Sequence, residues 1–83
     1  MPKYMDVHNI AGGIDAATVA AIHAKDLEHQ KAHGVQFLKY WLDEEQGKVF
    51  CLSEAPDASA PNAVHQEANG IMADEVYEVG EFS

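Results

Sequence analysis

Two β-rich runs lie on either side of a short polar segment that ends in glycine. The runs span Val35–Leu42 and Lys48–Ala55, and the polar segment between them is Asp43–Gly47. β-Branched and aromatic residues favour strands, and a short polar loop that ends in glycine is typical of a β-hairpin. The centre of the chain is therefore predicted to form two adjacent antiparallel strands.

A long helix is predicted in front of this hairpin. Residues Ala16–His33 contain no glycine or proline and are rich in Ala, Leu, Lys, Glu and Gln, which favour helix. Asp15 is placed to accept hydrogen bonds from the free N–H groups of the first turn, and Gly34 is placed to end the helix. Tyr4–Ile10 alternates with a period of two, which predicts a strand before the helix.

The C-terminal part is predicted to add a second helix and a last strand. Ser59 is expected to cap a short helix with Pro61 in its first turn, and Gly70 is expected to end it. Asp74–Phe82 follows as the last strand. The order β-α-β-β-α-β is that of the ferredoxin-like α+β fold, a four-stranded antiparallel sheet with two helices on one face. We expect one such domain over residues 1–83.

The charge balance argues against several classes of partner. The chain has 14 acidic and 5 basic residues and a formal net charge of −9. Nucleic acid is not expected as a partner, because phosphates are held by clustered Lys and Arg. A membrane is not expected either, since no apolar run approaches the roughly 20 residues that a span requires and there is no basic face for anionic lipid.

Cysteine content and size give two further expectations. Cys51 is the only cysteine, so an internal disulfide is excluded. A reducing cytoplasm fits a single thiol, and no signal peptide is apparent behind the N-terminal residues Met1–Tyr4. A domain of this size buries only about 60% of its unfolded surface, which favours a homodimer formed through the open face of the sheet.

Histidine is the unusual residue of this composition, with five in 83 positions. His23 on the first predicted helix and His65 on the second are expected at the same level, because the two helices run antiparallel side by side. Asp26 lies three residues after His23, on the same helical face. Imidazole and carboxylate are ligands of nickel, zinc, copper and iron. His23, Asp26 and His65 are therefore predicted to form one site for a divalent transition metal.

Asp6 and His8 are two further candidate ligands. They lie two residues apart and share one face of the first predicted strand. They join the metal site if that face is turned toward the helices, and otherwise they line the open face and meet a partner subunit. The alternation leaves both placements open, because Met5 and Val7 compete for the buried side.

Other titratable residues are interpreted as structural. His29 and His33 lie four residues apart near a helix C-terminus, where an exposed imidazole is common. Cys51 lies inside a β-rich run and is interpreted as a small buried apolar side chain. No sequence motif of a nucleophile with its base, and no glycine-rich phosphate loop, is present.

Two functions of other classes stay open beside metal binding. One is a dimeric α/β-barrel enzyme, oxygenase- or isomerase-like, with a pocket on the open sheet face lined by Trp41, Tyr40 and Phe50 and with His8 as acid or base. The other is an acidic protein-interaction module, which predicts salt-sensitive association with a basic partner and no affinity for metal.

The chain also resembles a bacterial domain-of-unknown-function family of small proteins. The resemblance covers about residues 4 to 80 and rests on Tyr4–His8, Ala21–Leu27, Gly34–Val35 with Tyr40–Trp41, Val49–Pro56, Ala63–Ala68 and Ala73–Val76. The family includes a nickel-binding protein with a dimeric ferredoxin-like fold. The resemblance therefore implies a homodimer that binds nickel first, with zinc or copper as the other candidates.

The same resemblance bears on the candidate ligands. Asp6, His8, His23, Asp26 and His65 fall inside its motif segments, whereas the other two histidines do not. The residue four positions after His65 is asparagine, where many members of the family have a second histidine. If that histidine is a ligand in those members, the resemblance implies that metal affinity or metal choice differs in this chain.

Overall fold

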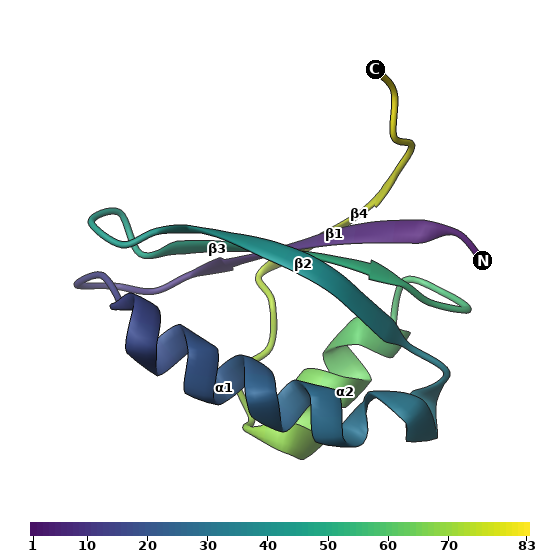
Figure 1. Cartoon of the computed structure of the whole chain (residues 1–83), viewed down its shortest axis with the longest axis horizontal. Coiled ribbons are helices and arrows are strands. Elements are labelled where there is room, and N and C mark those ends of the chain that lie inside the picture. The colour runs from purple at the N-terminus through teal and green to yellow at the C-terminus, as the bar shows by residue number, and fades with distance from the viewer.

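The chain folds into one antiparallel sheet with both helices on one face, as predicted (Figure 1). The computed structural model describes all residues, 1–83. In chain order the elements are β1 (Lys3–Asn9), α1 (Ala16–His29), the short 3-10 helix η1 (Gln30–His33), β2 (Gln36–Asp43), β3 (Lys48–Glu54), α2 (Ala60–Ala68) and β4 (Glu75–Val79). This is the β-α-β-β-α-β order of the ferredoxin-like fold.

The strand order β2-β3-β1-β4 brings together residues that are far apart in sequence. In the antiparallel pairing of β1 with β3, Asp6 lies opposite Cys51, and His8 lies opposite Val49. On the other side of β3, Cys51 lies opposite Tyr40 of β2. Because side chains alternate between the faces of a sheet, these residues share the face that the helices cover.

The ends of the first helix follow the sequence closely. Asp15 caps α1, and its carboxylate accepts a hydrogen bond from the backbone N–H of Thr18 at 2.8 Å. The predicted last turn tightens into η1, which Gly34 ends in a left-handed conformation with φ of 69°. A glycine adopts this conformation without the steric cost that a Cβ brings.

The second helix begins with a different cap from the one expected. Ser59 has helical backbone angles and makes no capping hydrogen bond with its side chain. Asp57 takes the role instead, because its carboxylate accepts hydrogen bonds from the backbone N–H groups of Ser59 at 2.9 Å and of Ala60 at 3.1 Å. Ser59 does stand at the predicted position directly before α2, but its side chain does not make the capping bond.

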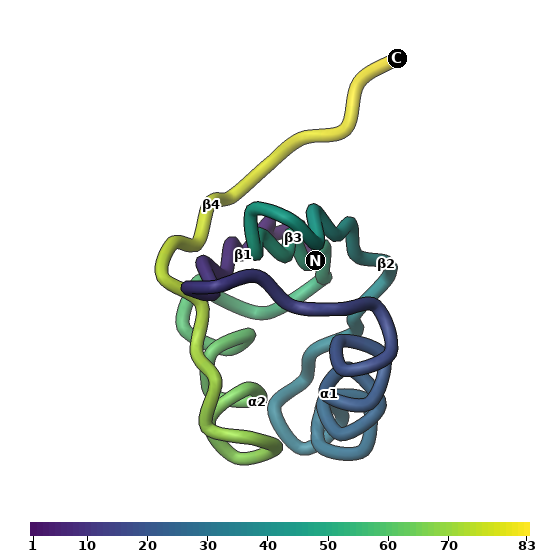
Figure 2. Tube along the Cα trace, turned by 90° about the vertical axis from the view of Figure 1, so that its left-hand side faces the viewer, coloured from purple at the N-terminus to yellow at the C-terminus, as the bar shows by residue number.

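The last strand is shorter than predicted. It ends at Val79, and the following residues extend away from the body of the protein on the side opposite the helices (Figure 2). Phe82, predicted to lie in the strand, is 93% exposed. None of the helices is both long enough and apolar enough to cross a membrane.

Candidate metal centre

Strand pairing and helix packing gather four donor side chains into one buried cluster. Asp6 and His8 come from β1, Cys51 from β3 and His65 from α2. One ligand atom from each lies within 4.8 Å of the others, and all four residues are buried. We call these four residues the buried cluster. Asp6 and His8 thus face the helices, which settles the choice that the alternation of β1 left open.

His65 lies at the centre of the buried cluster between two carboxylates. Its Nε2 donates a hydrogen bond to Oδ2 of Asp6 at 2.9 Å, and its Nδ1 donates one to Oδ1 of Asp26 at 3.0 Å. Burial lowers the pKa of His65, but the hydrogen bonds to Asp26 and Asp6 outweigh it and raise this pKa to about 9. The ring is therefore an imidazolium at neutral pH, with both nitrogens protonated.

The contacts of Asp6 are incomplete. Burial raises the pKa of Asp6, but the contacts with His65 and His8 outweigh burial, so the pKa of Asp6 lies below its ordinary value. Nε2 of His8 is 3.2 Å from Oδ1 of Asp6, yet this oxygen has no aligned hydrogen-bond partner, and neither has Nδ1 of His8. Buried polar atoms without partners are rare in folded proteins and ask for an explanation.

Two buried carboxylates, Asp6 and Asp26, share the single ring of His65. A cation bound beside Asp6 would supply a partner for its free Oδ1.

Cys51 is the member of the buried cluster that sequence reasoning missed. Burial and the nearby carboxylate of Asp6 raise the pKa of the Cys51 thiol far above its ordinary value, so it is protonated at neutral pH. Its place in the buried cluster follows from the pairing of β3 with β1, which sets Cys51 opposite Asp6. The two residues are 45 positions apart, so only the strand order of the assumed fold could have linked them.

The structure places Asp26 and His23 around the buried cluster, outside its four donors. Asp26 is buried and accepts hydrogen bonds from His65 and, at 3.1 Å, from Nδ2 of Asn69. His23 is half-buried, with its ring centroid 4.7 Å from that of Tyr40. Burial lowers the pKa of His23, with a smaller opposing effect from Asp26.

A small cavity opens beside the buried cluster. It has a volume of about 40 Å³, and three histidines, His8, His23 and His65, line it. Its remaining walls are mostly apolar, with Ile14 and Ile22 among them. This volume exceeds the roughly 10–15 Å³ that one water needs, so there is room for an ion with a water, but not for a drug-sized substrate.

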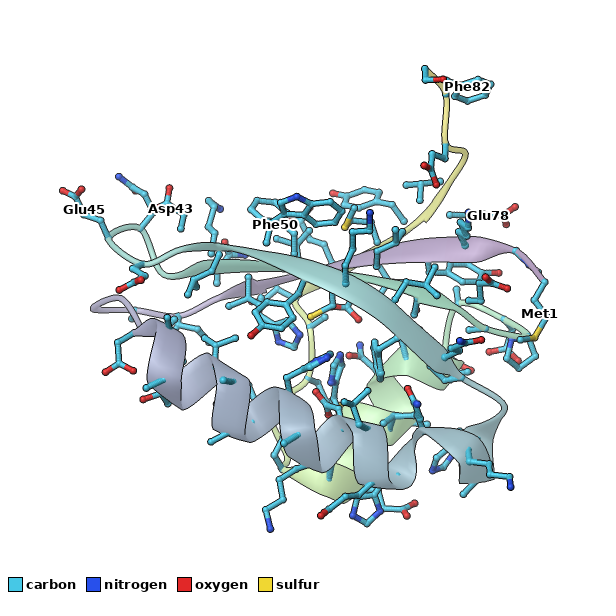
Figure 3. All side chains as sticks on the ribbon, in the orientation of Figure 1. Met1, Asp43, Glu45, Phe50, Glu78 and Phe82 are labelled. Atoms are coloured by element: carbon cyan, nitrogen blue, oxygen red, sulfur yellow. The ribbon has the colours of Figure 1, made fainter.

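The residues of the enzyme pocket considered from the sequence do not come together. Trp41 and Phe50 lie opposite each other and point away from the helices, where Figure 3 labels Phe50. Tyr40 and His8 lie on the helix-covered face. Tyr40 is the neighbour of Trp41 in β2, and His8 is paired with Val49, the neighbour of Phe50 in β3, and neighbouring residues of a strand point to opposite faces. The open face does carry a hollow of about 360 Å³ that Trp41 helps to line, but no histidine lines it. The four residues thus lie on two different faces of the sheet, and the prediction that they line one pocket was wrong.

A protein of known structure shows the same fold with substantial sequence identity. The chain is similar to SCO4226 from Streptomyces coelicolor A3(2), whose crystal structure matches it with a TM-score of 0.89. The two sequences are 38% identical, and the match covers 98% of this chain and 99% of that one. No curated protein matches the sequence. Residues 4–79 match the family described as "Nickel responsive protein SCO4226-like". The chain therefore belongs to the SCO4226-like family of nickel responsive proteins.

Proposed function

We propose that this protein binds a divalent transition metal ion, nickel first, with the buried cluster of Asp6, His8, Cys51 and His65 as its ligands. The observation that carries the proposal is the convergence of these donors within 4.8 Å, together with buried atoms of Asp6 and His8 that have no hydrogen-bond partner. Carboxylate, imidazole and thiolate together suit nickel, zinc and copper. The description of the family as nickel responsive favours nickel among them.

In this proposal Asp26 orients a ligand. It holds Nδ1 of His65 at 3.0 Å, and a carboxylate in this position fixes the ring of a metal-binding histidine and raises its basicity. His23, expected from the sequence as a ligand, borders the cavity beside Tyr40 and stays outside the donor set. In this proposal Asp26 still contributes to the site, but it orients His65 and is not itself a ligand.

Metal binding would have to displace protons. Nε2 of His65 and Sγ of Cys51 both carry a proton at neutral pH, as their raised pKa values indicate. A metal ligand must offer a free lone pair, so binding releases protons and weakens as the pH falls. Such a closed, proton-coupled site fits metal storage or sensing better than catalysis, because the cavity of about 40 Å³ leaves little room for a substrate.

The proposal includes a homodimer in a bacterial cytoplasm. The open face of the sheet carries exposed aromatic residues, Trp41 and Tyr77, which a second copy of the chain would cover. The single thiol of Cys51 is buried and unpaired, which suits a reducing compartment. Neither a nucleic acid nor a membrane is part of the proposal.

Nickel titration of the protein stripped with a chelator tests the metal site. We expect wild-type protein to bind Ni²⁺ with proton release and to develop near-ultraviolet absorption from a nickel–thiolate bond. Cys51→Ser is expected to abolish that absorption, and His8→Asn to weaken binding at this site by about tenfold or more, since each removes a ligand. Calorimetry in two buffers of different ionisation enthalpy measures the released protons.

Ser53→Ala provides a matched control. Ser53 is buried two residues after Cys51 on the same face of β3, and its Oγ also has no hydrogen-bond partner. This change therefore alters the same layer without removing a ligand and should leave nickel binding intact. Absorption and proton release that persist in Cys51→Ser and His8→Asn would refute the proposed site. Salt-sensitive binding to a basic protein without any metal affinity would instead favour the acidic interaction module.

A further inference from the structure

The segment after β4 carries the most exposed large apolar side chain of the protein. Phe82 is 93% exposed, and it stands away from the sheet on the side opposite the helices (Figure 3). Its ring lies against its own segment, since a Cβ built on Gly80 would be 2.9 Å from it. Burial of an exposed phenylalanine ring in an apolar site is favourable. Phe82 therefore presents a large apolar surface that the rest of its own chain does not cover.

A hollow on the open face of the sheet has the size and the lining that such a ring requires. Its volume is about 360 Å³. A cavity of roughly 150 Å³ already holds benzene. Its apolar lining comes from Met5, Trp41, Leu52 and Val79. Aromatic rings pack favourably against each other, so Phe82 can lie beside Trp41 in this hollow.

The charges around the hollow also suit the segment that carries Phe82. Lys3 and Lys39 line the hollow, and they are two of only five basic residues in an acidic chain. Nζ of Lys3 is 3.2 Å from Oε1 of Glu81 in the same chain, whereas Nζ of Lys39 lies 5.8 Å from the centre of the Trp41 ring and makes no ion pair. Lys39 can therefore meet an incoming carboxylate, and residues 80–83 contain Glu81 and no basic residue.

The path of the segment favours the hollow of a second copy over its own. Gly80 and Glu81 themselves line the hollow, and the chain then leads away from the sheet (Figure 2). Phe82 follows Glu81 directly, so it can reach its own hollow only if the chain reverses within one residue. Three extended residues, from Val79 to Phe82, span up to about 10 Å, which matches the roughly 10 Å between two sheets packed face to face. The ring thus stands where a second sheet would lie.

We propose that residues 80–83 of each copy cross to the other copy and place Phe82 in its hollow beside Trp41. Because this exchange rests on the proposed homodimer, it names a residue that each copy contributes to the other. In a symmetric dimer both segments leave from the shared face, so each meets the hollow of the partner and two equivalent contacts form.

Sedimentation velocity of Phe82→Ala tests this exchange. We expect wild-type protein to be a dimer and Phe82→Ala to weaken association by about a hundredfold or more, because each dimer loses two buried rings. Leu27→Ala is the matched control. It also removes an exposed apolar side chain, but Leu27 lies on α1, on the other side of the sheet, and its loss should leave association unchanged.

Isotope-filtered NMR determines which copy receives the ring. In a sample mixed from labelled and unlabelled protein, only contacts between copies give filtered cross-peaks, and we expect them between the rings of Phe82 and Trp41. Trp41 is the only tryptophan, so its resonances are unambiguous. Absence of these cross-peaks, or a contact of the two rings within one copy alone, would overturn the exchange.

The outcomes also separate this exchange from the proposals on which it rests. A wild-type dimer that Phe82→Ala leaves intact overturns the exchange while the dimer stands. A wild-type protein that is monomeric at all concentrations overturns both. Nickel–thiolate absorption reports on the buried cluster independently of either result, because Phe82 lies on the opposite side of the sheet from its four donors.

Discussion

His65 links the stability of this protein to pH. Its pKa in the folded protein is raised to about 9 from an ordinary value of 6.5, because two carboxylates contact its ring. The folded state thus holds a proton that the unfolded chain releases above about pH 6.5. The stabilisation is fully present below that pH and is lost as the pH rises toward 9. The difference in pKa corresponds to roughly 3 kcal/mol.

We therefore expect the unfolding free energy of the metal-free protein to fall by roughly 3 kcal/mol between pH 6.5 and pH 9. Urea unfolding in the presence of a chelator measures it. Below pH 6.5 the stability should also decline, because burial lowers the pKa of His23 and the folded state then resists a proton that the unfolded chain accepts.

Comparison with His65→Gln separates this effect from the titration of other groups. Glutamine retains hydrogen-bonding capacity but does not titrate, so the variant should be less stable at pH 6.5 and should lose less stability up to pH 9. The buried thiol of Cys51 adds some loss near pH 9 in both proteins, since its pKa is raised on folding. Parallel profiles for the two proteins would contradict the role given to His65.

At the scale of single residues, the sequence identified the chemistry of the site better than its geometry. His65, Asp26, Asp6 and His8 were all candidates, and the structure brings them together. Alternation alone could not decide which face of β1 is buried, because Val7 on the other face is itself nearly as buried as His8. The choice depends on the register with β3, which is a contact between distant parts of the chain.

At the scale of elements, the turn between β2 and β3 rests directly on the loop after β1. The backbone N–H of Ile10 donates a hydrogen bond to the carbonyl of Gly47 at 2.7 Å. Gly47 has a φ of +67°, and a Cβ built on it would lie 2.1 Å from the carbonyl oxygen of Ile10. Ile10 also lines the cavity beside the buried cluster, so this contact helps to shape the site.

Gly47→Ala is therefore expected to destabilise the protein much more than Gly12→Ala. Gly12 also has a positive φ, of +85°, but a Cβ there would meet nothing within 4 Å. The left-handed backbone costs alanine about 1 kcal/mol at either position. The clash at Gly47 should add about 2 kcal/mol or more, because backbone must move. Urea unfolding of both variants measures the difference, and equal losses would show that the close approach is relieved at no cost.

The helices and strands themselves were largely predictable, since local signals specify them. Asp15 as the cap of α1 and Gly34 as the end of the helical segment were both confirmed. Both could be predicted because each acts on backbone atoms only a few residues away. Ser59 stands at the predicted cap position, but the carboxylate of Asp57 makes the capping hydrogen bonds, because the choice depends on the path by which the chain leaves β3. The end of β4 was wrong because the pairing with β1 stops at Val79, opposite Lys3.

At the scale of the whole molecule, the open face of the sheet differs in charge from the rest of the surface. Strand register places three lysines and three acidic residues on this face: Lys3, Lys39, Lys48, Asp43, Glu54 and Glu75. The strand residues of this face thus carry no net charge, and Glu81, which lines its hollow beside Lys3, adds one negative charge, although the chain carries a net charge of −9. Two copies can therefore approach each other through this face with less electrostatic repulsion than the net charge of the chain alone would give.

The open face also carries apolar side chains that a second copy would bury. Trp41 is 47% exposed and Tyr77 is 51% exposed, and Nζ of Lys39 lies 5.8 Å from the centre of the Trp41 ring. Exposed tryptophan is among the residues that contribute most to protein interfaces. A symmetric dimer uses the same patch on both copies, so one substitution changes the interface twice.

We expect wild-type protein to sediment as a dimer and Trp41→Lys to shift it toward monomer. Loss of the ring should weaken association by about 2 kcal/mol or more, and the new charge adds repulsion across the symmetric interface. Leu27→Lys is the control, because Leu27 is similarly exposed, at 43%, but lies on α1 on the far side of the molecule. Sedimentation velocity over a range of concentrations compares the three proteins. If the wild-type protein is a monomer at all concentrations, the proposed dimer does not exist. If only Leu27→Lys disrupts the dimer, the contact lies elsewhere, since the proposed dimer depends on the open face of the sheet alone.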